Sequence, residues 1–370
     1  MSETIPSSEI IVKSHKLNST KQLRLLENKW TTLFNRADSA FFLSWRWIAS
    51  FAHNVLDSGY TLHLTEAMHC DETVGLGFFV KTQETRNILF RYTQLYLHKT
   101  GNDALDKSWI EYNDFVLDAR APKAIRAAMW SFVISHFSDV DEFILGVSEK
   151  EVCDETSAIF KRFLVRDYLH SIGYKLPISA DGDTKYKSAQ TRSQIRRSIK
   201  LIEQMGITFT LSRDNKDYLS ALTKLRPMHK NTWQEESGFC TDTFVKHMEL
   251  LAQYNDSTEL ISAELSDANN VVAVLIGFVH KDTFYYYLSA NETSTDNKLK
   301  YGLSLHHFVI QWCSQQGLKH YDLLAGDYRY KRSFTDNTLQ FSYLFFQRPS
   351  LKTKLEHCLR GIKKGLFSKE

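Results

Sequence analysis

Apolar residues recur along this chain with two periods, and these periods predict its helices and strands. Residues 20–35 place Leu23, Leu26, Trp30 and Leu33 on one stripe at helical spacing. Similar helical patterns occupy residues 41–55, 122–137, 192–206, 217–233, 242–254 and 301–317. Runs rich in β-branched and aromatic residues predict strands at residues 61–69, 73–83, 92–101, 109–119, 141–148, 207–212, 259–265, 271–280, 283–291, 319–326 and 339–347.

The order of these elements is repeated after a polar, turn-rich stretch at residues 177–191. Each half reads as two helices, several strands, a helix and a strand, which predicts an α/β (α+β) architecture with a mixed sheet in each half. We therefore expect domains at residues 1–180 and 181–350, followed by a tail at 351–370. The two halves share this order of elements, whereas their sequences show no repeat.

Composition narrows the class of protein. The 370 residues are 43% hydrophobic and 13% aromatic, which is ample for two cores and excludes a disordered chain. With 46 basic and 43 acidic residues, the net charge of +3 does not favour a DNA-binding protein. The N-terminal residues do not resemble a signal peptide, and the longest apolar run, 271–279, is shorter than the ~20 residues of a membrane span.

The cysteines give no framework for a disulfide or a metal. The five stand far apart without a CxxC pair, at positions 70, 153, 240, 313 and 358. We interpret them as reduced thiols of a cytoplasmic protein and expect no metal site.

Candidate chemistry is densest where the strand at 319–326 ends. Gly326 allows a sharp turn, and Asp327, Tyr330 and Lys331 follow within five positions. Tyr330 could act as a general acid, Asp327 could accept a proton, and Lys331 could neutralise a phosphate or carboxylate. The alternative is a solvated turn with a surface ion pair.

A second candidate region precedes the helix at 301–317. Lys298, Lys300 and Gly302 suit an anion site, because a helix N-terminus offers backbone N–H groups and a positive dipole end. An ordinary loop is the alternative. In the helix at 217–233, His229 and Trp233 share a face, as a substrate-binding pair or as a packed histidine. Asn113 and Asp114 of the segment EYNDF suit a structural turn.

Two basic segments allow contact with acidic partners. The first spans residues 185–200, with six bases and no acid, and is either a solvated face or a surface that steers a phosphorylated donor or an acidic glycan. In the tail, Leu351, Leu355, Leu359, Ile362 and Leu366 fall on one side of a basic amphipathic helix. Such a helix can lie on the inner face of an anionic membrane, although we favour its docking on its own domain.

Taken in order, several motifs resemble one family. They are FFLSWRW, RSQIRRSIKLIEQMG, LRPMHKNTWQEESG, the strand pair VVAVLIGFV and TFYYYLSAN, YGLSLHHFVIQW, and YDLLAGDYRYKRSF. Together they resemble acetyltransferases of the GNAT superfamily in the CelD/BioF2-like group, named after the cellulose-biosynthesis protein CelD. The resemblance spans residues 40 to 347, and its most specific part is the strand that ends in Asp-x-x-x-Gly-Asp-x-x-Tyr-Lys.

The resemblance implies tandem GNAT folds like those of the Fem aminoacyltransferases, each a mixed, mostly antiparallel sheet flanked by helices. It implies acyl transfer from acetyl-CoA or another acyl-CoA to an amine or hydroxyl of a small-molecule or glycan acceptor, such as an envelope or polysaccharide precursor. The family pattern assigns catalysis to Asp327, Tyr330 and His229. It assigns donor binding to Lys300, Tyr301, Gly302, Leu303 and Ser304, and acceptor binding to Trp233, Asp322, Gly326 and Lys331.

The chain departs from the family pattern at the donor loop. Leu299 stands where a basic residue is common, Ser304 stands where the last glycine is common, and Lys-Tyr-Gly replaces Ser-Pro-Gly. Two alternatives to acyl-CoA transfer follow. One is a Fem-like transferase that takes an amino acid from aminoacyl-tRNA, and the other is a non-catalytic binding partner in exopolysaccharide synthesis.

Overall fold

The computed structural model describes residues 5–86, 90–108, 110–179, 188–233, 241–254, 259–268 and 270–356. Its chain forms two compact units. Unit 1 comprises residues 1–170 and 341–370, and unit 2 comprises residues 171–340. The boundary expected between residues 180 and 181 lies outside the described residues.

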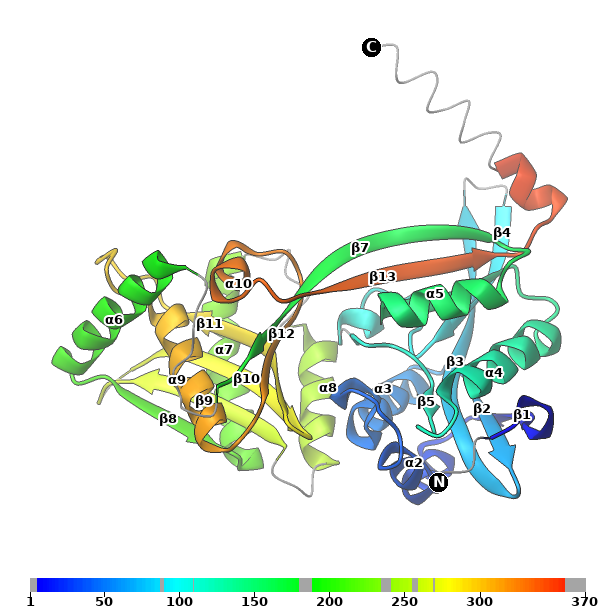
Figure 1. The fold of residues 1–370 in the computed structure, drawn as a ribbon, viewed down its shortest axis with the longest axis horizontal. Helices are drawn as coiled ribbons and strands as arrows, with labels where there is room; N and C mark the ends of the chain where they lie inside the picture. The colour runs from blue at the N-terminus through cyan, green and yellow to red at the C-terminus, as the bar shows by residue number, and fades with distance from the viewer. Residues whose placement is uncertain are drawn as a thin grey trace, which may run out of the picture. The chain divides into compact units, whose positions relative to one another are not determined.

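The sheet of unit 1 has the strand order β1-β2-β3-β4-β6-β13, with β5 paired to β3 (Figure 1). The strands are β1 (Ile11–Leu17), β2 (Leu62–His69), β3 (Glu72–Arg86), β4 (Phe90–Leu97), β5 (Val116–Leu117), β6 (Glu142–Glu149) and β13 (Thr338–Gln347). The helices are α1 (Thr20–Arg24), α2 (Glu27–Phe34), α3 (Trp45–Asp57), α4 (Pro122–His136) and α5 (Lys150–Ile159), with 3₁₀ turns η1 (Ser7–Glu9), η2 (Phe41–Leu43) and η3 (Leu105–Lys107).

Alternating side chains of β3 show which helices cover each face of this sheet. Phe79 packs with Trp130 of α4 in one core cluster. The preceding residue, Phe78, stacks on Trp30 of α2, with ring centroids 5.1 Å apart. Helices α4 and α5 therefore cover one face, and α2 and α3 cover the other.

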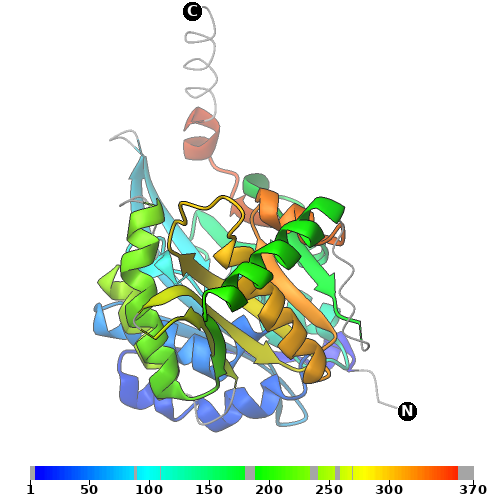
Figure 2. The ribbon, with the colours of Figure 1, turned by 90° about the vertical axis from the view of Figure 1, so that its left-hand side faces the viewer.

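Unit 2 has the strand order β7-β12-β11-β10-β9-β8. The strands are β7 (Leu164–Pro177), β8 (Thr208–Ser212), β9 (Leu260–Ser266), β10 (Val271–His280), β11 (Thr283–Asn291) and β12 (His320–Ala325). The helices are α6 (Ala189–Gln204), α7 (Asn215–Trp233), α8 (Asp242–Gln253), α9 (Tyr301–Gln315) and α10 (Arg329–Phe334). Figure 2 shows α6 and α9 on one face of the sheet and α7 on the other.

The two units repeat one topology. In each, three consecutive antiparallel strands lead through a helix to a parallel strand: β2-β3-β4, α4 and β6 in unit 1, and β9-β10-β11, α9 and β12 in unit 2. Each sheet is completed by a strand from elsewhere in the sequence, since β13 pairs with β6 and β7 pairs with β12, both antiparallel. This confirms the predicted mixed, mostly antiparallel α/β fold.

Most predicted elements are present, with some corrections. The strand expected at residues 109–119 is reduced to Val116–Leu117, and the helix expected at 20–35 is interrupted at Leu25–Leu26. Sequence patterns missed β1, α5, β7 and α10.

Hydroxyl side chains cap the N-termini of two of the predicted helices. Ser44 accepts a hydrogen bond from the backbone N–H of Trp47 at the start of α3, and Thr241 accepts one from that of Phe244 at the start of α8.

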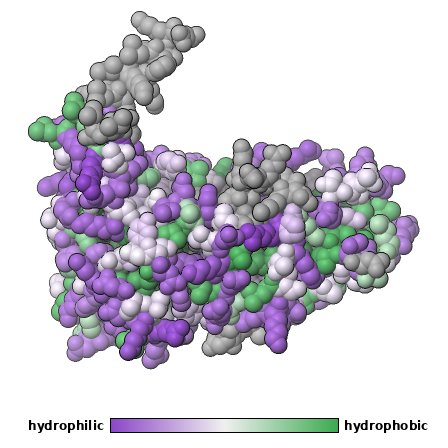
Figure 3. All heavy atoms as spheres, turned by 180° about the vertical axis from the view of Figure 1, so that it is seen from behind, coloured by the Kyte–Doolittle hydropathy of each residue, from purple (hydrophilic) through white to green (hydrophobic). Residues whose placement is uncertain are grey.

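The start of the tail docks differently from the expectation. Residues 351–356 are helical, but Leu351 and Leu355 remain 86% and 55% exposed. Instead, Thr353 and Glu356 are buried, and the Tyr92 hydroxyl donates to Glu356 Oε2 at 2.6 Å. Figure 3 shows apolar atoms at the surface beside the last described residues. Residues 357–370, with the rest of the predicted stripe, lie outside the described residues.

The length and hydropathy of each helix indicate whether it could span a membrane. Among the helices in the described ranges, none combines the length and apolar character needed to cross a bilayer.

Candidate active site

The candidate site lies where β11 and β12 part. These parallel strands pair only from Thr283 to Tyr285 with His320 to Asp322. Just beyond that point, β11 carries a bulge, because Gly277 of β10 pairs with Tyr286 and Ile276 pairs with Leu288, so that Tyr287 has no opposite residue in this ladder. Bulges of this kind are frequent next to active sites, where they redirect side chains and free backbone groups.

The end of β12 is irregular at the same level. Its pairing with β7 shifts between Asp322 and Ala325, and Leu324 adopts a left-handed φ of 61°. The Asp322 carboxylate is fully buried and accepts the Leu324 N–H at 2.8 Å. Asp322 was expected to bind the acceptor. In the structure its carboxylate holds the irregular backbone of β12 in this geometry.

An aromatic cluster surrounds this opening on the α9 face. His306 of α9 is buried, and its Nδ1 lies 2.7 Å from the Tyr321 hydroxyl. The imidazole contacts the ring of Tyr286 edge-on at 4.6 Å and the ring of Tyr330 at 5.6 Å. The hydroxyls of Tyr330 and Tyr286 share a hydrogen bond, and Tyr286 also bonds Ser289 Oγ at 2.9 Å.

Burial fixes the protonation states of this cluster. Desolvation lowers the pKa of His306 to about 3, with a smaller contribution from Lys331, so the imidazole is neutral at pH 7. Desolvation, reinforced by Tyr286, raises the pKa of Tyr330. The Tyr330 hydroxyl therefore keeps its proton at neutral pH.

The turn after β12 buries some of the predicted residues and exposes others. Gly326 has a φ of 110°, and an added Cβ would lie 2.8 Å from the Tyr328 ring. Lys331 is buried, and its Nζ donates to the carbonyl of Ala325 at 2.7 Å and to that of Leu324 at 3.3 Å. Lys331 therefore stabilises the end of β12 from the first turn of α10.

Asp327 lies at the exposed rim of the same turn. Its Oδ1 accepts from the Tyr174 hydroxyl at 2.6 Å and lies 3.1 Å from Arg332 Nε. Burial, followed by this contact with Asp327, raises the pKa of Tyr174 to about 12. Asp327 thus faces solvent while two side chains hold it in place.

The predicted donor loop forms the first turn of α9. Lys300 is the N-cap, and its N–H donates to Ser198 Oγ of α6 at 2.8 Å. Ser304 Oγ donates to the same Ser198 Oγ at 2.8 Å, and both serines are buried. Tyr301 is buried in the core, and Leu303 packs against that core. Only the backbone and Lys300 of this predicted group are therefore placed to meet a ligand.

Gly302 has a packing role. A Cβ at this position would lie 2.8 Å from Asn291 Oδ1, at the end of β11. The glycine lets the first turn of α9 approach the end of β11, which brings the helix N-terminus next to the opening between β11 and β12.

Helix α6 adds positive charge beside that N-terminus. It packs along α9, and Arg196, Arg197 and Lys200 are exposed on it. These bases, together with Lys298 and Lys300, fit the phosphates of a nucleotide-bearing donor, because oriented N–H groups and cations both favour anions.

His229 and Trp233 come from the other side of the sheet. His229 is buried on α7, and desolvation lowers its pKa. Since α7 covers the face opposite α9 (Figure 2), the structure separates His229 from the cluster around His306. Trp233 is the last residue of α7, and its side chain lies outside the described residues.

Sequence reasoning missed four side chains that the fold gathers here, namely Tyr286, His306, Tyr321 and Ser198. Each occupies a regular position in an apolar strand or helix, where its pattern is that of the core. Their only sequence signal was polar chemistry inside the segments TFYYYLSAN, YGLSLHHF, KHYDLLAG and IRRSIK.

Comparison with known proteins identifies this region. Residues 189–332 match the model of a family described as Acetyltransferase (GNAT) domain. No curated protein matches the chain in sequence.

Solved structures share the fold over nearly the whole chain. FemX superposes with a TM-score of 0.56 at 12% identity, covering 89% of this chain and 96% of FemX. L-PGS from Bacillus licheniformis gives a TM-score of 0.53 at 11% identity, covering 93% of this chain and 96% of that protein. At such identities the likeness concerns the fold alone. Residues 189–332, which hold the parted strands, the N-terminus of α9 and the tyrosine cluster, form a GNAT-type acetyltransferase domain.

Proposed function

We propose that unit 2 transfers an acyl group from acetyl-CoA or another acyl-CoA to an amine or hydroxyl. The observation that carries this proposal is the parting of β11 and β12 beside the N-terminus of α9. A thioester in that opening would lie against the bulged backbone of β11, with its phosphates toward α9 and the bases of α6.

The chain's own groups supply the chemistry that such a transfer needs. Backbone N–H groups released by the β11 bulge would stabilise the oxyanion that forms when the acceptor attacks the thioester carbon. As the carbon–sulfur bond breaks, Tyr330 would donate its proton to the leaving thiolate. Asp327 is the candidate that accepts the proton of the attacking amine or hydroxyl, since it faces solvent at the same turn.

An exposed aromatic residue supports a sugar-bearing acceptor, such as a polysaccharide or envelope precursor. Tyr328 is 49% exposed, and its ring stacks beside Tyr330 with centroids 6.2 Å apart. An exposed tyrosine next to the proton donor suits the apolar face of a sugar ring.

Calorimetry with acetyl-CoA tests the donor. We expect binding by the wild type and at least about tenfold weaker binding by the double variant Arg197→Glu/Lys300→Glu, which replaces attraction for phosphates by repulsion. Lys216→Glu is the matched control, because this exposed lysine lies on α7 at the opposite face, and its affinity should equal that of the wild type. No binding by the wild type would reject the acyl-CoA proposal.

The exposed bases of α6 favour one alternative donor, aminoacyl-tRNA. A chain that binds charged tRNA but not acetyl-CoA would support it. In that case the logarithm of the affinity should fall linearly with the logarithm of salt concentration, and the slope should shrink in the Arg197→Glu/Lys300→Glu variant.

A further inference from the structure

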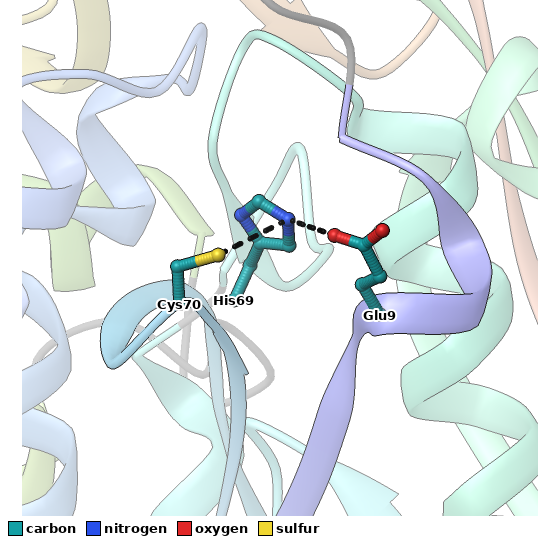
Figure 4. A group of neighbouring side chains, drawn as sticks. All are labelled: Glu9, His69 and Cys70. Carbon is teal, nitrogen blue, oxygen red and sulfur yellow. Dashed lines mark hydrogen bonds and ion pairs between the residues drawn. The ribbon is translucent and has the colours of Figure 1, made fainter.

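Three side chains of types that can bind a metal meet in unit 1, from two segments that are far from the candidate active site in sequence. Glu9 ends the 3₁₀ turn η1, His69 ends β2, and Cys70 begins the two-residue turn from β2 to β3. Figure 4 shows the Glu9 carboxylate and the Cys70 thiol directed to the imidazole of His69.

The spacing of their ligand atoms suits one small cation. His69 Nε2 lies 3.0 Å from Glu9 Oε2 and 3.7 Å from Cys70 Sγ, and all three atoms lie within 4.8 Å of one another. A tetrahedral zinc ion binds nitrogen and oxygen at about 2.0–2.2 Å and sulfur at about 2.3 Å, which places its ligands about 3.3–3.8 Å apart. The Cys70–His69 separation falls within that range, and the Glu9–His69 separation is about 0.3 Å below it, so a small side-chain movement would admit the ion.

The types of ligand also select the metal. A thiolate, an imidazole and a carboxylate form a mixed set that zinc accepts, whereas magnesium and calcium prefer oxygen alone. Nearby Glu72 does not compete for the ion, because Arg36 and Arg120 both pair with its carboxylate.

We propose that Glu9, His69 and Cys70 bind one Zn²⁺ ion, with water in the fourth tetrahedral position. Binding converts the Cys70 thiol to a thiolate and releases its proton to solvent, so that zinc affinity falls as the pH is lowered. The ion would join η1 to the β2–β3 hairpin. No sequence motif indicates this site, because sixty positions separate Glu9 from His69 and no CxxC or HxxxH spacing is present.

Calorimetric titration of the full chain with Zn²⁺ alone tests the proposal. We expect one ion per chain, with about one proton released, and a near-ultraviolet thiolate charge-transfer band when Co²⁺ replaces Zn²⁺. Cys70→Ser should abolish that band and weaken zinc binding by about tenfold or more. Glu9→Gln and His69→Asn should each weaken binding as well, and circular dichroism should show that these surface variants keep the fold.

Two controls separate this site from other ligands in the chain. His53→Asn removes a histidine that lies 3.5 Å from Asp57 with no thiol in the pair, and it should bind zinc like the wild type. Cys358→Ser tests His357 and Cys358, which are adjacent in sequence, and should also leave affinity unchanged. The proposal is overturned if the wild type binds no zinc, or if Cys70→Ser binds it as tightly as the wild type.

Discussion

In both units the two parallel strands of the sheet separate at the same topological position, but different side chains lie between the separated strands. In unit 1, parallel strands β4 and β6 pair over three residues each, Gln94 to Tyr96 with Glu142 to Ile144, as β11 and β12 do in unit 2. Beyond this point, the buried Asn113 donates from Nδ2 to the carbonyl oxygens of Leu97 and Leu145. One amide side chain therefore connects the two parted strands of unit 1.

Other contacts hold that amide in place. Asn113 Oδ1 lies 2.9 Å from His98 Nδ1, and its backbone N–H donates to Val147 O at 2.8 Å. Gly146, with a φ of 88°, leaves room for it, since a Cβ there would lie 2.6 Å from Asn113 Nδ2. In unit 2, the corresponding level is surrounded by Tyr286, His306 and Tyr330 instead. At this one position of the fold, unit 1 places a buried amide that joins the strands, whereas unit 2 places an imidazole and two phenols.

The largest expected effect concerns Tyr330, the proposed proton donor of unit 2. Tyr330→Phe removes the hydroxyl without changing the ring, and we expect the kcat of acyl transfer to fall by about 10²–10⁴ while donor affinity stays the same. Tyr96→Phe, at the parting of the strands in unit 1, is the control and should leave kcat unchanged. An unaltered kcat in Tyr330→Phe would remove Tyr330 from the proposed mechanism.

The amide of unit 1 should matter for stability alone. Asn113→Leu leaves the carbonyls of Leu97 and Leu145 without their donor, and each unsatisfied buried group costs about 1–3 kcal/mol. We expect the free energy of unfolding of unit 1 to fall by about 3 kcal/mol, measured by urea denaturation. Acetyl-CoA affinity should not change, and a lower affinity would show that unit 1 takes part in donor binding.

The buried histidines of both units should make the free energy of unfolding fall at acidic pH. The folded-state pKa of His306 is about 3 and that of His98 is about 4, against 6.5 when unfolded, so the unfolded chain binds more protons between these values. Stability from each is complete above pH 6.5 and is lost as the pH falls toward the folded-state pKa. His306→Gln should therefore lose less stability than the wild type between pH 7 and pH 4, as followed by urea denaturation at each pH. Equal losses would contradict the burial of a neutral His306.

The smallest expected effect is at the first turn of α9. Gly302→Ala places a Cβ against Asn291 Oδ1, which rotates away at a cost of about 1 kcal/mol or less. We expect a donor dissociation constant raised by a few fold, and partial recovery in Gly302→Ala/Asn291→Ala. A stronger effect in the double variant would mean that Asn291 itself contributes to the site.

The sequence predicted elements better than it predicted their partners. Strands β10, β11 and β12 and helix α9 followed from periodicity, because each buries one apolar stripe or face. Asn113 was expected to be structural, and its buried hydrogen bonds confirm this. The pairing of β13 with β6 has no local signal, since strands are matched by tertiary packing.

The same limit applies to the candidate site. Gly326, Asp327 and Tyr330 stood out because polar residues interrupted an apolar run. His306 and Tyr286 could not be distinguished from core residues, because their role depends on which helix face meets which strand. Whether Asp327, Tyr330 and the other expected residues act in catalysis stays a prediction that the variants above test.

The late position of β13 in the sequence has a consequence for how this chain folds during its synthesis on the ribosome. Synthesis proceeds from the N-terminus, so β7 is available before the rest of unit 2, whereas β13 is made only after unit 2 is complete. The edge of β6, with Phe143 and Leu145 in the core cluster, must wait for Phe341 to Gln347 to emerge. Nascent unit 1 thus exposes an unpaired strand edge throughout the translation of unit 2. We expect aggregation through this edge, and any need for a chaperone, to be greatest during that interval.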